Sequence, residues 1–192
     1  MNICVYGASS SSIAKSYINA TEELGLKLAA RGHNLVYGAG ALGLMGAVAR
    51  GTKKGGGRVT GVVPTFFKVD GALFDECDEM LYTETMRERK AIMEERADAF
   101  IMTPGGLGTY DEFFEILTLK QLGRHTKPVA VLNINGYFNP LTTLLENAAN
   151  KQFMTAASLR LCPFFDSADR LLDYIEDYHG EFTSIGDYKD IR

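Results

Sequence analysis

The sequence predicts an α/β domain built on a mostly parallel, doubly wound sheet of about seven strands, with helices on both faces. Two observations support this prediction. Short β-branched runs alternate with longer segments of helical periodicity, and glycine clusters directly follow three of those runs. Such alternation favours right-handed crossovers between parallel strands and ligand binding at the strands' carboxyl ends. We therefore expect a Rossmann-like fold.

The first half of the chain opens with a βαβ unit. An apolar run, a long stretch of helical periodicity and a second apolar run follow one another. A second helix then ends at the glycine turn Gly55-Gly56-Gly57, and two further strands follow. The expected elements are strand 3–6, helix 13–31, strand 34–37, helix 44–53, strand 59–63 and strand 79–82.

The second half begins with a charged helix, after which strands and helices alternate. We expect residues 1–180 to form a single nucleotide-binding catalytic domain and residues 181–192 to form a polar tail. The expected elements are helix 86–97, strand 99–103, helix 109–122, strand 129–132, helix 140–152, strand 161–165 and helix 167–178.

Net charge argues against a nucleic-acid or membrane partner. The chain of 192 residues carries a net charge of −4, so it has no overall basic field that would attract a polyanion or an anionic membrane. No apolar run could cross a bilayer, and the first residues lack the basic and apolar regions of a signal peptide. We expect a cytoplasmic protein with, at most, a local phosphate site.

Cysteine and histidine spacing predicts neither disulfides nor a metal site. The cysteines are odd in number, widely spaced and beside apolar segments, which is typical of reduced core residues. The histidines lack the spacing of metal ligands. The residues concerned are Cys4, Cys77, Cys162, His33, His125 and His179.

The three glycine clusters, 7–12, 38–46 and 104–109, should open on one edge of the sheet. Backbone amides at a glycine-rich helix start can approach an anion closely, and the helix dipole favours it. The middle cluster formally contains GxGxxG, but the next strand ends Gly61-Val62-Val63-Pro64, with no acid for a ribose hydroxyl. A tight turn with close helix packing therefore competes with dinucleotide binding at this cluster.

The third cluster precedes a predicted helix whose first turn carries Asp111 and Glu112. Residues 105–109 are the candidate phosphate loop. Thr109 and Glu112 also have the spacing of a capping box, which by itself would account for Glu112. Arg89 and Lys90 begin the charged helix, where a solvated face with intrahelical ion pairs is the alternative to a role in the site.

Residues 104–112 read PGGLGTYDE and fit PGGxGTxxE, the signature of the Lonely Guy (LOG) family of cytokinin riboside 5′-monophosphate phosphoribohydrolases. Residues 86–93 similarly resemble the family's MxxRKAxM helix. Residues 37–46 resemble its YGGGxxGLMG loop, with Ala39 in place of one glycine, and residues 135–137 resemble its NxxGYY loop. The resemblance implies a homodimer that releases the base from a purine nucleoside 5′-monophosphate.

Many members of the family carry an older label as lysine decarboxylases. That chemistry needs a Schiff-base lysine holding pyridoxal phosphate and a partner for its ring nitrogen, and the sequence offers no such constellation. We therefore expect no cofactor and no metal. A non-catalytic nucleotide or cofactor carrier or sensor of the same fold is the alternative function.

With this resemblance, Arg89 and Glu112 are the predicted catalytic pair. Arg89 precedes Glu112 by one helix and one strand, so consecutive elements can bring the two side chains together. The predicted substrate contacts are Lys90, Gly105, Gly106, Leu107, Gly108, Thr109, Tyr110, Asp111, Ser9, Gly40 and Thr118.

Overall fold

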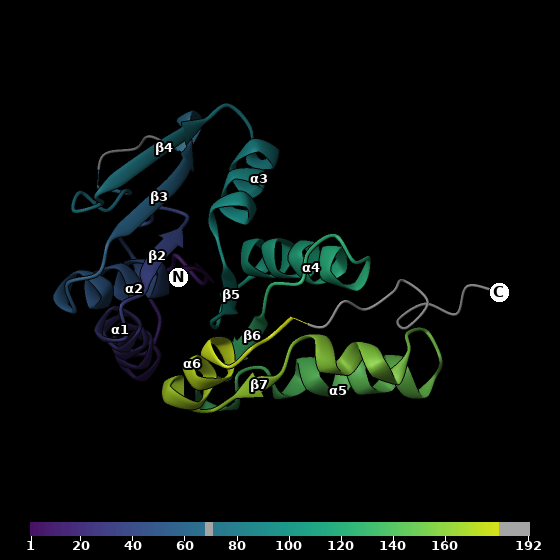
Figure 1. The fold of residues 1–192 in the computed structure, drawn as a ribbon. Coiled ribbons are helices and arrows are strands. Elements are labelled where there is room, and N and C mark those ends of the chain that lie inside the picture. The colour runs from purple at the N-terminus through teal and green to yellow at the C-terminus, as the bar shows by residue number, and fades with distance from the viewer. Residues whose placement is uncertain (68–70, 181–192) are drawn as a thin grey trace.

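The computed structural model describes residues 1–67 and 71–180, which form one parallel sheet covered by helices on both faces (Figure 1). The strand order is β4-β3-β2-β1-β5-β6-β7, and each adjacent pair is parallel. The predicted Rossmann-like fold with seven strands is confirmed. The strands are β1 (Asn2–Tyr6), β2 (Asn34–Tyr37), β3 (Val59–Pro64), β4 (Glu79–Thr83), β5 (Ala99–Met102), β6 (Val129–Leu132) and β7 (Phe164–Phe165).

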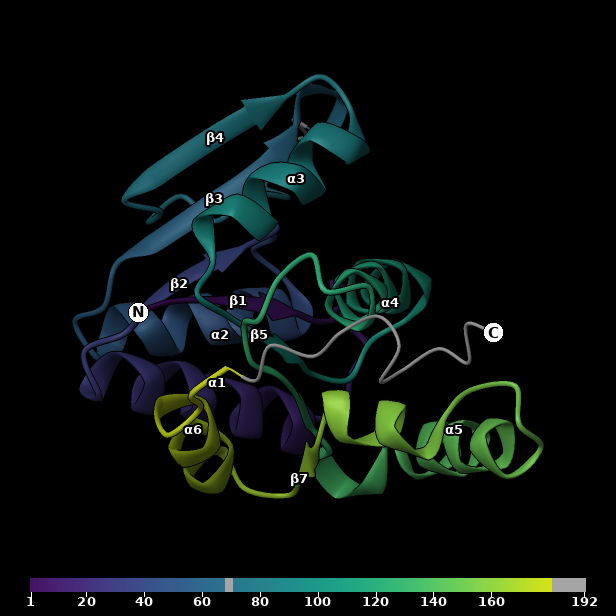
Figure 2. The same cartoon turned by 45° about the vertical axis from the view of Figure 1, so that its right-hand side comes forward.

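The helices divide between the two faces of the sheet (Figure 2). One face packs against α1, α2 and α6, and the other against α3, α4 and α5. The helices are α1 (Lys15–Ala30), α2 (Gly43–Lys54), α3 (Met86–Arg96), α4 (Leu107–Gln121), α5 (Asn139–Asn150) and α6 (Ala168–Glu176). Three short 3₁₀ segments are η1 (Thr65–Phe67), η2 (Ile134–Gly136) and η3 (Ala156–Leu161).

Alternating side chains of the central strands build two separate core layers. Ile3 and Val5 of β1 face the α1 side, whereas Cys4 and Tyr6 face the α3 and α4 side. This alternation is the two-residue period of a strand, and burial of both faces explains why the strands are almost wholly apolar. The sheet therefore holds α3 and α4 on the same face.

The point where the chain changes direction across the sheet lies between β1 and β5. From β1 the chain builds β2, β3 and β4 outward on one side, and then returns to place β5 on the other side of β1. In open α/β sheets, ligands bind outside the carboxyl ends of the two strands that flank such a point. The segment after Tyr6 and the loop after Met102 meet there.

Several predicted boundaries differ from the structure by one or two residues, and two differences affect the argument. The strand expected at 161–165 is reduced to Phe164–Phe165, because the parallel pairing with β6 covers these two residues and Leu161 ends the 3₁₀ segment η3. The helix expected to begin at Thr109 begins instead at Leu107. The second difference changes the interpretation of the site.

The three cysteines are free, with Cys4 and Cys162 buried and Cys77 partly buried, as the sequence predicted. The tail at 181–192 lies outside the described residues. Within the described residues, no helix combines the length and apolar character needed to span a bilayer.

Candidate active site

The start of α4 presents free backbone amides at the carboxyl end of β5. Gly106 is the N-cap residue, with φ −105° and ψ −151°, and no side chain caps the helix. Within the described part of the chain, the amides of Gly106, Leu107, Gly108 and Thr109 have no acceptor, and the Tyr110 amide is the first to bond back, to Gly106 O at 3.0 Å. Such a helix start is suited to an anion.

This geometry excludes the capping box at Thr109. Thr109 and Glu112 both lie inside α4, because Gly106 adopts an extended conformation and lets the helix begin directly after it. Thr109 is buried and packs against Gly105, where a Cβ would lie 2.6 Å from the Thr109 Cβ. Glu112 is therefore not explained by capping.

Two hydrogen bonds from outside the loop hold it in place. The Ala8 amide, just after β1, donates to Pro104 O at 3.1 Å. The Tyr137 hydroxyl, just after β6, donates to Gly105 O at 2.7 Å. The loop between β5 and α4 is thus supported from the two neighbouring strands, while Gly106 and Gly108 face open space.

The middle glycine cluster is closed to ligands at its helix start. The Leu44 and Met45 amides, in the first turn of α2, donate to Ala8 O at 2.8 and 3.2 Å. Gly43 has φ +60°, and a Cβ there would lie 2.5 Å from the same oxygen. The GxGxxG pattern therefore serves a tight turn and close packing, and the α2 start does not offer the amides that a dinucleotide pyrophosphate needs.

Arg89 is placed by the first turn of α3. Thr85 and Glu88 form a capping box, in which the Thr85 hydroxyl accepts from the Glu88 amide at 3.2 Å and the Glu88 carboxylate accepts from the Thr85 amide. Arg89 and Met93, one turn apart, are the two buried residues of this helix. The alternative of a solvated helix face is thereby excluded for Arg89, whereas its neighbour Arg87 is exposed.

Arg89 and Glu112 form a buried ion pair between α3 and α4. Arg89 is 6% exposed and Glu112 is 8% exposed. Arg89 Nη1 donates to Glu112 Oε1, and Arg89 Nε donates to Val62 O at 3.0 Å. The guanidinium is thus oriented from both ends, by the β3 backbone and by the carboxylate.

Gly38, at the end of β2, leaves room for this guanidinium. A Cβ on Gly38 would collide with Arg89 Nη2 and would lie 2.6 Å from Met45 Cε. The sequence placed Gly38 in the GxGxxG pattern and in the segment that resembles the YGGGxxGLMG loop. No signal along the chain links it to Arg89, because the contact depends on how β2 and α3 pack.

Burial and ion pairing act in opposite directions on Glu112. Burial raises the pKa of the Glu112 carboxyl above its ordinary value, and the positive charge of Arg89 lowers it. The rise prevails, because removal from water is the larger effect. A carboxyl with a raised pKa next to a fixed positive charge is suited to proton transfer or charge stabilisation.

Lys90 lies beside this pair but is held by other partners. Its ammonium contacts Asp111, at 3.0 Å, and Glu115, and both partners are on α4. These contacts raise the pKa of Lys90, with Glu115 the larger cause, so the amine stays charged. Lys90 thus bridges α3 and α4, and its predicted substrate contact stays a prediction.

The predicted substrate contacts Ser9, Gly40 and Thr118 lie in different parts of the structure. Ser9 is exposed in the segment after β1, next to Ala8. Gly40 lies in the loop between β2 and α2, pairs with Leu73 in an isolated antiparallel bridge and is two residues from Gly38. Thr118 is exposed on α4, six residues beyond Glu112, which places it about 9 Å along the helix and on another face. The structure does not bring Thr118 to the Arg89–Glu112 pair.

A family model described as "Possible lysine decarboxylase" matches residues 45–175. Cytokinin riboside 5′-monophosphate phosphoribohydrolase LOG2 of Arabidopsis thaliana is 37% identical over 185 residues, covering 95% of this chain and 87% of that protein. LOG7 of the same plant is 39% identical over 183 residues, covering 95% and 84%. The chain belongs to the LOG family. The LOG-family motifs identified in the sequence form the candidate phosphate loop between β5 and α4, the start of α3 and the turn around Gly38.

Solved structures share the fold of this LOG family member. The molybdenum cofactor binding protein of Rippkaea orientalis aligns with a TM-score of 0.70 and 23% identity, covering 91% of this chain and 94% of that one. The molybdenum cofactor carrier protein of Chlamydomonas reinhardtii gives a TM-score of 0.69 and 20% identity, covering 92% and 96%. At these identities the likeness concerns the fold alone.

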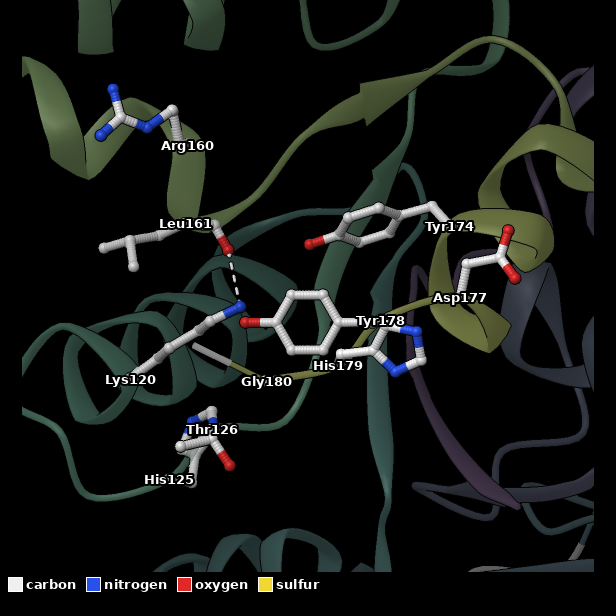
Figure 3. A pocket seen from close by; sticks show the side chains of 10 residues that line it. All are labelled: Lys120, His125, Thr126, Arg160, Leu161, Tyr174, Asp177, Tyr178, His179 and Gly180. Carbon is white, nitrogen blue, oxygen red and sulfur yellow. Dashed lines mark hydrogen bonds between the residues drawn. The ribbon is translucent and has the colours of Figure 1, made fainter. Parts of the chain in front are cut away.

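The residues do not fit the pyridoxal phosphate that a lysine decarboxylase would need. Lys90, next to Arg89 on α3, is held charged by two carboxylates. Lys120 is the described lysine whose pKa burial lowers, to about 8, and its ammonium donates to Leu161 O at 3.1 Å. It lines a cavity of about 410 Å³ near the carboxyl ends of α4 and α6 (Figure 3). Helix carboxyl ends disfavour a phosphate, so neither lysine offers a site for this cofactor.

Metal ligation has no support in the same residues. Residues 1–67 and 71–180 contain no group of three or more histidine, cysteine or acidic side chains arranged to hold an ion. The charged groups at the candidate site are Arg89, Glu112, Lys90 and Asp111, and each carboxylate there is paired with a cation.

Proposed function

We propose that this protein hydrolyses the N-glycosidic bond of a purine nucleoside 5′-monophosphate, releasing the base and ribose 5-phosphate. The base is adenine or an N6-modified adenine. One observation supports the proposal above others: a buried carboxylate paired with arginine lies one helical turn beyond the free amides of α4. The relatives at 37 and 39% identity are phosphoribohydrolases by name.

The phosphate loop and Glu112 are spaced to act on one substrate. A 5′-phosphate bound by the amides of Gly106 to Thr109 lies at the helix start, where the dipole stabilises it. Glu112 follows Thr109 by three residues, about 4.5 Å further along the axis. The ribose, attached to the phosphate, then extends toward the carboxylate.

Glu112 supplies the negative charge that the reaction requires. Breaking the bond between the sugar and the base builds positive charge on the ribose, as in glycoside hydrolysis. An ionised Glu112 stabilises that charge and orients or deprotonates the attacking water. Burial strengthens the interaction, because little water competes for the charge.

Arg89 acts as the partner of Glu112. Its guanidinium stays charged, and its contacts with Val62 O and Glu112 fix its plane. From this position it orients the carboxylate and contributes positive charge to phosphate or ribose oxygens. A lysine cannot reproduce both contacts, because it lacks the planar arrangement of donors.

The decisive experiment is a product analysis. The purified protein is incubated with AMP, N6-isopentenyl-AMP, GMP, CMP and adenosine, and the products are separated by chromatography. We expect free base from the adenine monophosphates and none from adenosine. Equal release from adenosine would contradict the role of the phosphate loop, and saturable binding of AMP without any release would favour a carrier or sensor.

Glu112→Gln tests the catalytic residue. The substitution preserves shape and one acceptor but removes the charge, and we expect kcat to fall by at least about 100-fold. Glu95→Gln is the matched control, since Glu95 is an exposed glutamate on α3 and should leave kcat unchanged. Circular dichroism checks the fold of both variants. Near-normal base release by Glu112→Gln would refute the mechanism.

A homodimer completes the proposal. The outer face of α4 carries an open groove with several apolar side chains, and Leu107 at its start is 89% exposed. Phe113 is fully buried, whereas Tyr110 and Phe114 line the groove. Light scattering should give about twice the chain mass of 21.1 kDa, and a monomer at working concentration would contradict the dimer.

The proposed location is the cytoplasm. Three free cysteines, two of them buried, are compatible with a reducing compartment. Fractionation of the cells that make the protein, followed by detection of the chain in each fraction, tests this part of the proposal.

A further inference from the structure

Tyr137 belongs to the segment after β6 that resembles the NxxGYY loop, and its side chain contacts the candidate phosphate loop at 105–109 directly. Its hydroxyl donates to Gly105 O at 2.7 Å, across 32 residues of sequence. The residue as a whole is 40% exposed, and the hydrogen bond itself is partly buried.

The segment that carries Tyr137 is rigidly built. Asn133 accepts from the Phe138 amide at 2.7 Å and donates to Asn139 at 2.8 Å, which closes the turn after β6. Asn135 has φ +53° and Gly136 has φ +71°, two left-handed residues that direct the chain back toward β5. The hydroxyl of Tyr137 is thereby fixed in space before any ligand binds.

The aromatic ring of Tyr137 is held as firmly as its backbone. It packs edge-to-face on Phe138, at 4.9 Å between centroids, and on Tyr17 of α1, at 6.1 Å. Partial burial raises the pKa of Tyr137, so the phenol keeps its proton and remains a donor. The ring is thus braced between α1 and the phosphate loop.

The Tyr137 hydroxyl contacts the peptide unit that joins Gly105 to Gly106. The Gly105 carbonyl and the Gly106 amide belong to one planar trans unit, in which the oxygen and the hydrogen point in opposite directions. Both flanking residues are glycines, whose backbone freedom lets such a unit rotate. Holding the oxygen on the Tyr137 side therefore turns the Gly106 N–H to the opposite, exposed side.

We propose that Tyr137 is a positioning residue for substrate phosphate: by holding Gly105 O, it aims the Gly106 amide at the phosphoryl group. The catalytic importance of Tyr137 rests on the proposed function. Its effect on phosphate affinity, however, can be measured without turnover. Tyr137 touches the loop and not the reacting atoms, so it should affect binding rather than the chemical step.

Tyr137→Phe tests the inference, because it removes one oxygen and keeps the ring. We expect KM for AMP to rise about three- to tenfold, the effect of one lost hydrogen bond, with kcat changed less than about twofold. The inhibition constant of inorganic phosphate should rise by the same factor. A fall in kcat at unchanged KM would overturn the inference, because it would indicate a disturbed chemical step.

Tyr17→Phe is the matched control. It removes a phenolic oxygen from the neighbouring ring of the same edge-to-face pair, without a contact to the loop. We expect wild-type KM and wild-type phosphate affinity from this variant. Equal weakening by Tyr17→Phe and Tyr137→Phe would overturn the inference, since ring packing would then explain both.

A measurement without substrate separates this inference from the proposed function. Inorganic phosphate is titrated into ¹⁵N-labelled wild type and Tyr137→Phe, and the Gly106 amide resonance is followed. We expect saturable shifts in the wild type and a three- to tenfold weaker affinity in the variant. Equal affinities, or no shift in the wild type, would overturn the inference. Phosphate binding of the expected strength without any base release would refute only the proposed hydrolysis.

Discussion

Gly38→Ala should displace Arg89 without touching any charged group. A Cβ at this position would collide with Arg89 Nη2 and lie 2.6 Å from Met45 Cε. Ordinary contacts between such atoms are about 3.5 Å, so the guanidinium has to retreat by about 1 Å or more. A displacement of 1 Å at a reacting centre costs about 100-fold, and we expect this loss in kcat/KM for base release.

A double-mutant cycle identifies the cause of that loss. Base release from AMP is measured for the wild type, Gly38→Ala, Arg89→Ala and the double variant. If Gly38 matters because it leaves room for the guanidinium, adding Gly38→Ala to Arg89→Ala should cost little further activity. Fully additive losses would refute the reasoning, and so would wild-type kcat/KM in Gly38→Ala.

Two further predictions concern the pH profile and the start of α3. Burial raises the pKa of Glu112, and the proposed mechanism requires its carboxylate form, so kcat/KM should fall with decreasing pH at a midpoint above the ordinary value of 4.5. The residual activity of Glu112→Gln should lack this acid limb, and an identical limb in both proteins would contradict the assignment. Thr85→Ala removes the capping box of α3 and should lower the free energy of unfolding by about 1 kcal/mol, seen as a decrease of about 2–4 °C in Tm. An unchanged Tm would show that the cap contributes nothing.

Most of the fold could be predicted from local patterns, because alternation of strands and helices leaves few possible topologies. The residue at which α4 begins could not be predicted in the same way. Thr109 and Glu112 match a capping box in sequence, but the extended conformation of Gly106 makes it the N-cap, three residues before Thr109. Competition between two valid helix starts is decided by backbone conformation, which the pattern of side chains does not contain.

The contacts of Arg89 and Glu112 could not be predicted from local patterns either. Arg89 has the sequence surroundings of a solvated residue, and only the packing of α3 over β3 buries it beside Val62 O. Ala39 illustrates the same limit. It occupies a position where the LOG family pattern has glycine, and the structure gives it φ +64°, the left-handed conformation that glycine adopts most easily. The sequence showed that alanine replaces glycine at this position, and the structure shows that the alanine adopts a backbone conformation that favours glycine.

The oxygen of Ala8 gives the protein a restriction that side-chain substitution cannot remove. It occupies the Leu44 and Met45 amides at the start of α2, the place where a relative of this fold could receive a second phosphate. Because the acceptor is a main-chain oxygen, substitution of the Ala8 side chain or of its neighbours leaves both amides hydrogen-bonded. Converting this scaffold to a user of NAD-like molecules would require rebuilding the segment after β1, by insertion or deletion.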